Sequence, residues 1–293
     1  MPDAEIRPFS DEHVDAATAL LAERHGRHLS SEPLLAREVD FRAQLRGEGL
    51  VALRAGELRA YLLGQTTDDD AFVDFAGCAA AEPELLRDLY AALAPQWERD
   101  RHRVYVPASD TVLVDVWFRL AFGLQFTLAV REPTPGRGEG VRVGRREDLE
   151  TVVRLEQAFT DHLRESPSFS ARGRETDEDI RADWEETWDD ERFTHLVVER
   201  DARVVGHALL YRRDTGDLRV PANSIDLALA VVRPDARGSG AGSALVAHAL
   251  GVAHERGFEA VTIDWRVVNL LADRFFRARG FRPTFVRLYR RVP

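Results

Sequence analysis

Alternating glycines between an apolar strand and a helix limit the fold of this chain more than any other feature. The sequence predicts a buried strand over residues 227–232 and a helix over residues 243–250. Glycine lets a backbone approach a ligand without interference from Cβ, and the first N–H groups of a helix point unbonded donors at an anion. The joining loop consists of Arg237, Gly238, Ser239, Gly240, Ala241 and Gly242. We therefore predict a loop that binds a pyrophosphate, with Arg237 adding a charge-assisted contact.

Two other interpretations of the loop stay open. A Rossmann dinucleotide site needs G-x-G-x-x-G directly after the strand, but Ser243 occupies the third glycine position and residues 233–236 separate strand from loop. Asp264 nevertheless lies near the spacing of a ribose-binding acid. The glycines are also consistent with a turn that serves only the fold.

The chain divides into two similar halves. Residues 133–140 (PTPGRGEG) are rich in Pro and Gly and contain no apolar side chain, which is typical of a linker. On either side we predict a strand, an amphipathic helix, a hairpin, a strand, a helix, a strand, a short helix and a closing strand. This repeated order indicates an internal duplication of an α/β unit, although any alternating α/β chain shares part of it.

A second motif lies C-terminal to the loop. The first set of residues is Val232-Arg233-Pro234, Arg237, Gly240 and Gly242, and the second is Asn269, Ala272, Phe275, Phe276 and Gly280-Phe281. In order and spacing they resemble the two signatures of the GCN5-related N-acetyltransferase (GNAT) superfamily, over about residues 141–292. The resemblance implies an α/β (α+β) fold of acyl-CoA N-acyltransferase (GNAT-like) domains, each a mixed, mostly antiparallel sheet flanked by helices.

The N-terminal half resembles this fold only in its element order and its closing glycine. Its counterpart of the loop, residues 77–83 (GCAAAEP), lacks the alternating glycines and the arginine, and Glu82 would repel phosphate. We therefore predict a tandem protein with a degenerate copy over residues 1–132, the linker over residues 133–140 and a catalytic domain over residues 141–293. Tandem arrangements occur in the family, mycothiol synthase being one.

The resemblance also implies a reaction with acetyl-CoA as cosubstrate. In the family, a neutral amine attacks the thioester directly and the CoA thiolate leaves. A carboxylate, or water held by it, can take the ammonium proton, and motif register puts Asp226 where several members have a glutamate base. A solvated acid at a strand edge is the alternative for Asp226. Backbone N–H groups near Val231 and Val232 would stabilise the oxyanion, because in the family this strand separates from its neighbour there.

Phe276 departs from the family pattern. Many members have a tyrosine at this position, which protonates the thiolate, and a phenyl ring has no proton to give. Tyr289 or Tyr211 would have to replace it unless they only pack, or the thiolate leaves unassisted because a thiol pKa is about 8.5. Asn269 is typical of an N-cap and often touches the cofactor arm in the family. The predicted cofactor contacts are thus residues 237–242, Val231, Val232, Asn269 and Phe276.

An acidic segment is the candidate acceptor site. Residues 175–191 contain ten acids and one arginine, with Trp184 and Trp188 on one helix face. In this fold the early helices border the acceptor pocket, so the two tryptophans and Tyr211 could line a mouth for a cationic amine. A solvated helix with both tryptophans on the core is the alternative. His162 and His195 have no partners at metal-ligand spacing, and we interpret them as structural or exposed.

Composition limits the classes of ligand and partner that we expect for this chain. The net charge of −10 argues against nucleic acid, and the single cysteine forms no intrachain disulfide or Cys-rich zinc site, so we expect no metal. No apolar run approaches a membrane span and no signal peptide is visible, so we expect a cytoplasmic protein without a membrane partner. Lysine is absent, which indicates a GC-rich, bacterial genome. We predict an N-acetyltransferase acting on a small-molecule primary amine; a non-catalytic acyl-CoA-binding protein and a protein or peptide amine acetyltransferase are the alternatives.

Overall fold

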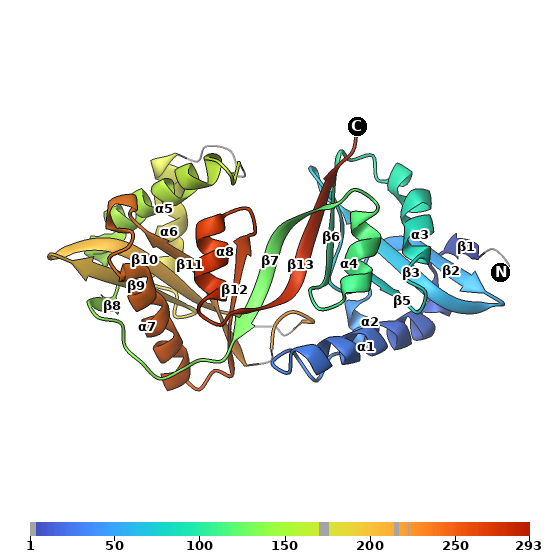
Figure 1. Ribbon diagram of the computed structural model, residues 1–293, viewed down its shortest axis with the longest axis horizontal. Helices are drawn as coiled ribbons and strands as arrows, with labels where there is room; N and C mark the ends of the chain where they lie inside the picture. The colour runs from blue at the N-terminus through green and yellow to red at the C-terminus, as the bar shows by residue number, and fades with distance from the viewer. Residues whose placement is uncertain (1–3, 170–175, 214–216, 222) are drawn as a thin grey trace. The chain divides into compact units, whose positions relative to one another are not determined.

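The chain forms two compact units. The computed structural model describes residues 4–169, 176–213, 217–221 and 223–293 (Figure 1). Unit 1 comprises Met1–Leu128, Gly216–Ala222 and Pro283–Pro293, and unit 2 comprises Ala129–Thr215 and Asn223–Arg282. The predicted boundaries at residues 132 and 141 stay a prediction. The contacts assign the last eleven residues to unit 1, whereas the repeat in the sequence groups them with the second half.

Unit 1 is built on a mixed sheet. Its strands are β1 (Glu5–Pro8), β2 (Glu48–Arg54), β3 (Glu57–Thr66), β4 (Ala71–Val73), β5 (Cys78–Ala80), β6 (Arg101–Pro107) and β13 (Arg282–Arg291), and β7 (Gly123–Arg131) begins in it. Neighbouring strands follow the order β1-β2-β3-β4-β6-β13, with β5 paired to β3. The β4–β6 pair is parallel and the β13–β6 pair antiparallel.

Helices cover both faces of the unit 1 sheet. They are α1 (Val14–Ser31), α2 (Phe41–Gln44), α3 (Leu85–Leu93) and α4 (Thr111–Phe118). Because side chains alternate along a strand, Leu50 and Ala52 of β2 join the core under α3 and α4, whereas Val51 and Leu53 pack with α1. Two apolar cores therefore lie on opposite faces of one sheet.

Strand β13 completes unit 1. It pairs with β6 in a register that places Phe285 opposite Pro107 and Leu288 opposite Val104. Phe285 and Leu288 are each 0% exposed and belong to the two cores of this unit. The last strand of the sequence repeat is therefore a structural part of the first unit.

Unit 2 repeats the element order of unit 1. Its elements are β8 (Val141–Val143), α5 (Leu149–Arg164), α6 (Asp177–Trp188), β9 (Phe193–Arg200), β10 (Arg203–Arg212), β11 (Ser224–Val232), α7 (Ala241–Glu255), β12 (Ala260–Arg266) and α8 (Leu270–Arg277). The strand order is β12-β11-β10-β9-β8. Only β11 and β12 are parallel among the pairs described within it, so the sheet is mixed and mostly antiparallel, as predicted.

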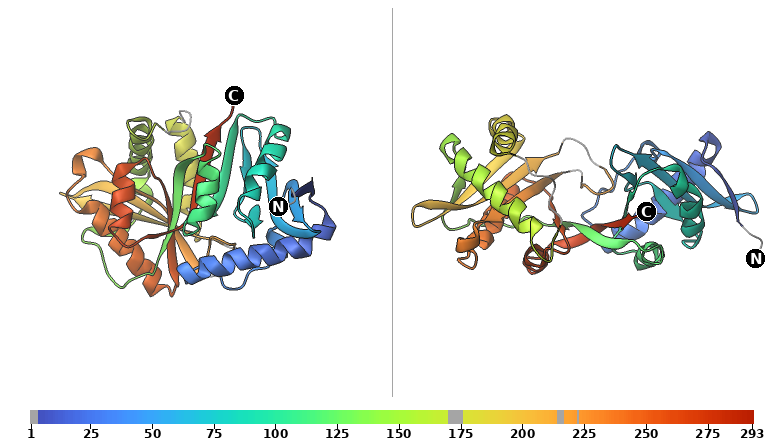
Figure 2. Two further views of the ribbon diagram at one scale, coloured as in Figure 1. Left: turned by 45° about the vertical axis from the view of Figure 1, so that its right-hand side comes forward. Right: turned by 90° about the horizontal axis from the view of Figure 1, so that it is seen from above.

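The two faces of the unit 2 sheet carry different helices (Figures 1 and 2). Leu196, Ala208 and Ile225 face the core formed with α7 and α8. His195 and His207 alternate with these residues and contact Trp184 of α6. Helices α5 and α6 therefore form one layer, and α7 and α8 form the other.

The Pro- and Gly-rich segment lies against α7. A Cβ at Gly138 would stand 2.0 Å from the Ala244 carbonyl oxygen, and one at Gly251 would stand 1.9 Å from the Gly136 carbonyl oxygen. The Gly138 N–H also donates to His248 Nδ1 at 3.3 Å. Its glycines thus permit close backbone packing on a helix.

Candidate functional site

The glycine loop has the geometry of an anion site. Gly238 and Gly240 both have φ +82°, and a Cβ at either would meet no described atom within 4 Å. Glycine is therefore required here by the left-handed backbone and not by crowding. Gly240 is the N-cap of the 15-residue α7 and has no side chain to bond this helix end, whereas the Ala241 N–H donates to Ser239 Oγ at 3.4 Å. Gly242 is half-buried and Ser243 is exposed, so the positive dipole end of α7 is accessible to an anion at these two residues.

Strands β11 and β12 separate beside this loop. They pair only at their first three residues, ending with Asp226 opposite Thr262. On the other side of β11, Leu209 pairs with Leu229 and Leu210 pairs with Leu227, so Ala228 is an extra residue that forms a β-bulge. Ala228 is exposed although its strand is internal. The sheet therefore opens at the carboxyl ends of two parallel strands, where ligands commonly bind in open α/β sheets.

The two sequence motifs meet at the first turn of α7. A Cβ at Gly242 would lie 3.4 Å from the Phe275 ring of α8. Arg279 covers the same ring, with its guanidinium carbon 3.4 Å from the centroid, and donates to Ser243 Oγ. Burial lowers the pKa of Arg279. Sequence reasoning missed this cation, although its place next to Gly280 in the second motif could have indicated it.

Asn269 caps α8 at the other side of the opening. Its Oδ1 accepts a hydrogen bond from the Ala272 N–H at 3.3 Å, as predicted for an N-cap. The Asn269 side chain is 7% exposed, and His162 Nε2 of α5 lies 3.4 Å from the same Oδ1. The structure thus brings together an asparagine and a histidine that stand 107 residues apart.

Asp226 sits at the closed end of the opening. Thr262 Oγ1 donates to its Oδ1 at 2.8 Å, and Arg213 donates to its Oδ2 at 2.8 Å. Tyr211 lies directly opposite Asp226 on β10, and its ring stacks on Phe193 with centroids 4.6 Å apart. The structure therefore brings Tyr211 and Asp226 together, although their roles stay predictions.

The tryptophans of α6 cover two buried histidines. Trp188 stacks on His195 at 4.1 Å, and Trp184 meets the His207 ring edge-on at 5.2 Å. The histidines contact each other through Nδ1 and Nε2 at 3.2 Å. Burial lowers the pKa of His195 to about 4, and burial together with His195 lowers the pKa of His207 to about 3. Both tryptophans thus pack toward the sheet while keeping some exposure; Glu175 of the acidic segment lies outside the described residues.

Phe276 and Tyr289 lie in different units. Phe276 is 6% exposed, stacks on Trp265 at 5.5 Å and forms part of the core under α7. Tyr289 belongs to β13 in unit 1, where it pairs with Arg103. The structure does not bring Tyr289 into the unit that carries the loop.

The matching region of unit 1 is filled from within. β4 pairs with β6 at three residues and the chain then turns to β5, which pairs with β3. Arg24 of α1, 3% exposed, donates to the carbonyl oxygens of Phe75 and Cys78. The rings of Phe75 and Tyr105 lie 4.3 Å apart beside it. Side chains thus fill the space between β4 and β6 in unit 1. Its counterpart in unit 2, between β11 and β12, stays open.

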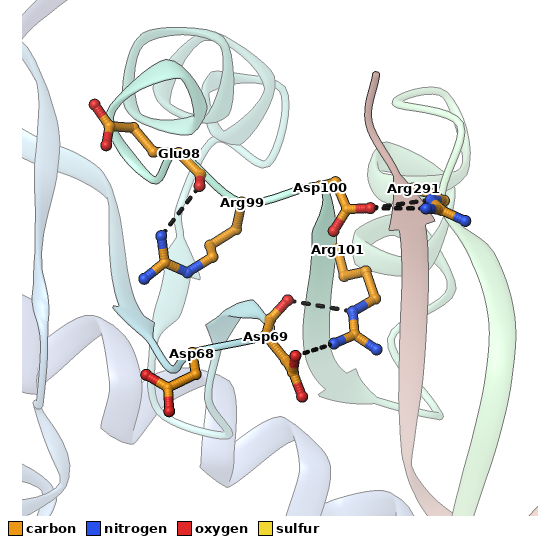
Figure 3. A pocket seen from close by; sticks show the side chains of 7 residues that line it. All are labelled: Asp68, Asp69, Glu98, Arg99, Asp100, Arg101 and Arg291. Carbon is orange, nitrogen blue, oxygen red and sulfur yellow. Dashed lines mark hydrogen bonds and ion pairs between the residues drawn. The ribbon is translucent and has the colours of Figure 1, made fainter. Parts of the chain in front are cut away.

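A polar pocket in unit 1 is lined by charged side chains. Its volume is about 470 Å³, and Figure 3 shows its lining of Asp68, Asp69, Glu98, Arg99, Asp100, Arg101 and Arg291. Arg101 pairs with Asp69 at 2.8 Å and Arg291 with Asp100 at 3.0 Å. Arg99 donates to the Thr67 carbonyl oxygen at 2.7 Å. The arginines are therefore already engaged, and we assign this pocket no ligand.

The described residues contain neither a cluster suited to a metal ion nor a helix suited to a membrane. No three His, Cys, Asp or Glu side chains are grouped so that they could hold a metal ion. Across the same part of the chain, no helix has the length and apolar character to cross a membrane.

Known proteins resemble both the sequence and the fold. The family model described as "Acetyltransferase (GNAT) family" matches residues 156–281. Uncharacterized N-acetyltransferases of Mycobacterium bovis and Mycobacterium tuberculosis are 31% identical over 101 residues, which span 34% of this chain and 60% of theirs. A GCN5-related N-acetyltransferase of Sphaerobacter thermophilus superposes with TM-score 0.58 at 17% identity, covering 99% of this chain and 96% of that one. A tandem GNAT protein from the clavulanic acid biosynthesis pathway gives TM-score 0.53 at 17% identity, with 99% of each chain covered.

Proposed function

Since this chain carries a GNAT acetyltransferase domain and has the tandem fold of GNAT proteins, we propose that unit 2 transfers an acetyl group from acetyl-CoA to a primary amine of a small molecule. One observation carries the proposal, namely the separation of β11 from β12 beside the N-terminus of α7, whose N-cap is Gly240. A pyrophosphate at the loop would accept hydrogen bonds from the first N–H groups of α7.

The opening suits the rest of the cofactor. Beyond Asp226 and Thr262, the two strands no longer bond to each other, so backbone donors and acceptors of β11 face the gap. The pantetheine arm of CoA carries two amides and can pair with these groups as an additional strand would. The thioester would then lie between the strands, near the backbone of Val231 and Val232.

The reaction follows from the groups along the gap. An amine with a pKa near 10.4 must lose a proton before it attacks, and Asp226, or water held by it, takes this proton. The amine nitrogen then bonds to the carbonyl carbon, and backbone N–H groups of β11 stabilise the oxyanion. When the intermediate collapses, the C–S bond breaks, its electron pair goes to sulfur, and the nitrogen releases its remaining extra proton.

Unit 1 has a supporting role in this proposal. Its counterpart of the loop lacks the glycines, and Arg24 with Phe75 and Tyr105 fills its counterpart of the opening. Acetyl-CoA would therefore bind once per chain. Exposed acids on α6, including Asp177, Glu178 and Asp183, favour a cationic acceptor near unit 2.

Calorimetry with acetyl-CoA tests the proposal. Gly240→Val is the test and Gly257→Val its matched control. Gly240 has φ +82° and Gly257 has φ +74°, and a Cβ at either position meets no described atom within 4 Å, so both variants strain the backbone alike. They lie at opposite ends of α7. We expect Gly240→Val to lose about tenfold or more in acetyl-CoA affinity, as loss of charge-assisted hydrogen bonds implies, and Gly257→Val to bind as the wild type does. Binding of a nicotinamide cofactor in place of acetyl-CoA would refute the proposal.

A further inference from the structure

We propose that His162 donates the proton that the CoA thiolate takes up when the thioester is cleaved. The inference rests on the proposed function and deepens it, because the reaction needs a proton donor that Phe276 cannot supply. Phe276 is buried against Trp265, and Tyr289 belongs to the other unit. An imidazole can donate a proton from one ring nitrogen while the other stays hydrogen-bonded, which suits a residue that gives and regains a proton.

The position of His162 follows from the two layers of unit 2. His162 is on the last turn of α5, which lies on the same face as Asp226, whereas α8 packs with α7 on the opposite face. A contact between α5 and α8 must therefore pass around the carboxyl edge of the sheet or through the gap in it. His162 Nε2 and Asn269 Oδ1 make this contact at 3.4 Å.

The thioester would lie at this carboxyl edge of the unit 2 sheet. Asn269 lies three residues after the end of β12, and the glycine loop follows β11 after the short turn of residues 233–236. These two strands separate after Asp226 and Thr262, so their carboxyl ends form the two sides of one gap. His162 stands at the β12 side of that gap, and Asp226 lies at its closed end. The two groups thus lie at separate positions along the gap in which the thioester would bind.

Asn269 determines which imidazole nitrogen is available. Its Oδ1 already accepts from the Ala272 N–H, so this atom is the carbonyl oxygen of the amide. An oxygen can only accept, and the facing His162 Nε2 must therefore carry a hydrogen. With Nε2–H held by Asn269, the other nitrogen, Nδ1, is the one that exchanges a proton with sulfur.

The proton balance of the step is complete. When the C–S bond breaks, the electron pair stays on sulfur, and the Nδ1–H of the His162 imidazolium transfers its proton to give CoA thiol. Neutral His162 then regains a proton from the amide nitrogen, which releases one, or from water. Two acids near His162 are engaged elsewhere: Asp161 pairs with Arg164 at 2.8 Å, and Asp273 of α8 accepts from Trp265 and Arg277 at 2.9 Å.

The ionisation of bound CoA tests this assignment without knowledge of the acceptor. A cation within about 4–6 Å lowers the pKa of an acid by about 1–3 units, so thiolate absorbance of protein-bound CoA should appear at lower pH in the wild type. His162→Gln and His162→Ala remove the imidazolium. We expect either change to raise the pKa of the bound thiol by about one unit or more. His254→Gln is the matched control, because His254 is exposed on the last turn of α7.

The outcomes separate this inference from the proposed function. An upward shift in both His162 variants but not in His254→Gln supports the assignment. Identical thiol titrations in the wild type and both His162 variants overturn it, as does a loss of CoA affinity of tenfold or more in both, which would make His162 a binding residue. If wild-type protein produces no heat with CoA, the proposed function itself has failed.

Discussion

The buried histidine pair of unit 2 should make its stability depend on pH. His195 and His207 are 4% and 0% exposed, with pKa values lowered to about 4 and about 3. In the unfolded chain each titrates near 6.5. Because the folded values lie below the unfolded ones, the folded state is fully favoured above about pH 6.5. This stability is lost as pH falls from 6.5 toward the folded values.

The size of the effect follows from these values. Between pH 8 and pH 5, the unfolded chain takes up nearly one proton at each histidine while the folded protein takes up almost none. At about 1.36 kcal/mol per pH unit, each histidine then costs unit 2 about 2 kcal/mol at pH 5. The pair together would cost on the order of 4 kcal/mol, an upper figure because the two rings interact.

Urea unfolding at pH 8 and pH 5 measures the effect, followed by tryptophan fluorescence, to which Trp184 and Trp188 beside the histidines contribute. His207→Gln removes one titrating group. Between pH 8 and pH 5, we expect the free energy of unfolding of this variant to decrease by about 2 kcal/mol less than that of the wild type. With typical slopes this difference corresponds to a midpoint change of about 1 M urea. His254→Gln should behave as the wild type does. Equal pH dependence in wild type and His207→Gln would refute the reasoning.

Three further substitutions test other parts of the structure. Gly138→Ala puts a Cβ 2.0 Å from the Ala244 carbonyl oxygen, so unit 2 should lose about 1–3 kcal/mol in urea unfolding. Asp226→Asn cannot take a proton, and we expect kcat to fall about 100- to 10,000-fold in a thiol-release assay at unchanged acetyl-CoA affinity; unchanged turnover would contradict its role as base. Trp117→Ala removes an indole that is 0% exposed, so scanning calorimetry should show unit 1 less stable by about 3–5 kcal/mol.

Local chemistry made much of the candidate site predictable. The glycines at positions 238 and 240 predicted a loop before a helix, which the structure has, and both adopt φ +82°, which was not predicted. Asn269 was predicted as an N-cap and caps α8. Such features depend on a few neighbouring residues, so they can be read from one segment at a time. The tandem GNAT-like fold followed from the same motifs and the repeated element order, and the comparisons confirm it.

Features that depend on distant residues were not predictable in this way. The contact of His162 with Asn269 and the pairing of Arg213 with Asp226 are set by packing, and we interpreted His162 as structural or exposed. The bulge at Ala228 has no signal in the sequence, because alanine is compatible with any regular strand. The repeat itself obscured the position of β13, because it groups this strand with the second half of the chain, whereas the strand pairs with β6 of unit 1.

Completion of unit 1 by β13 has a consequence for biosynthesis. During translation, the segment up to Leu128 leaves the ribosome long before residues 283–293 do, and until then β6 has β4 on one side and no β13 on the other. A bare strand edge is prone to pair with other chains. The nascent first half is therefore an aggregation hazard that ends only once Arg291 has emerged, and a gene cut at residues 133–140 would leave that hazard permanent.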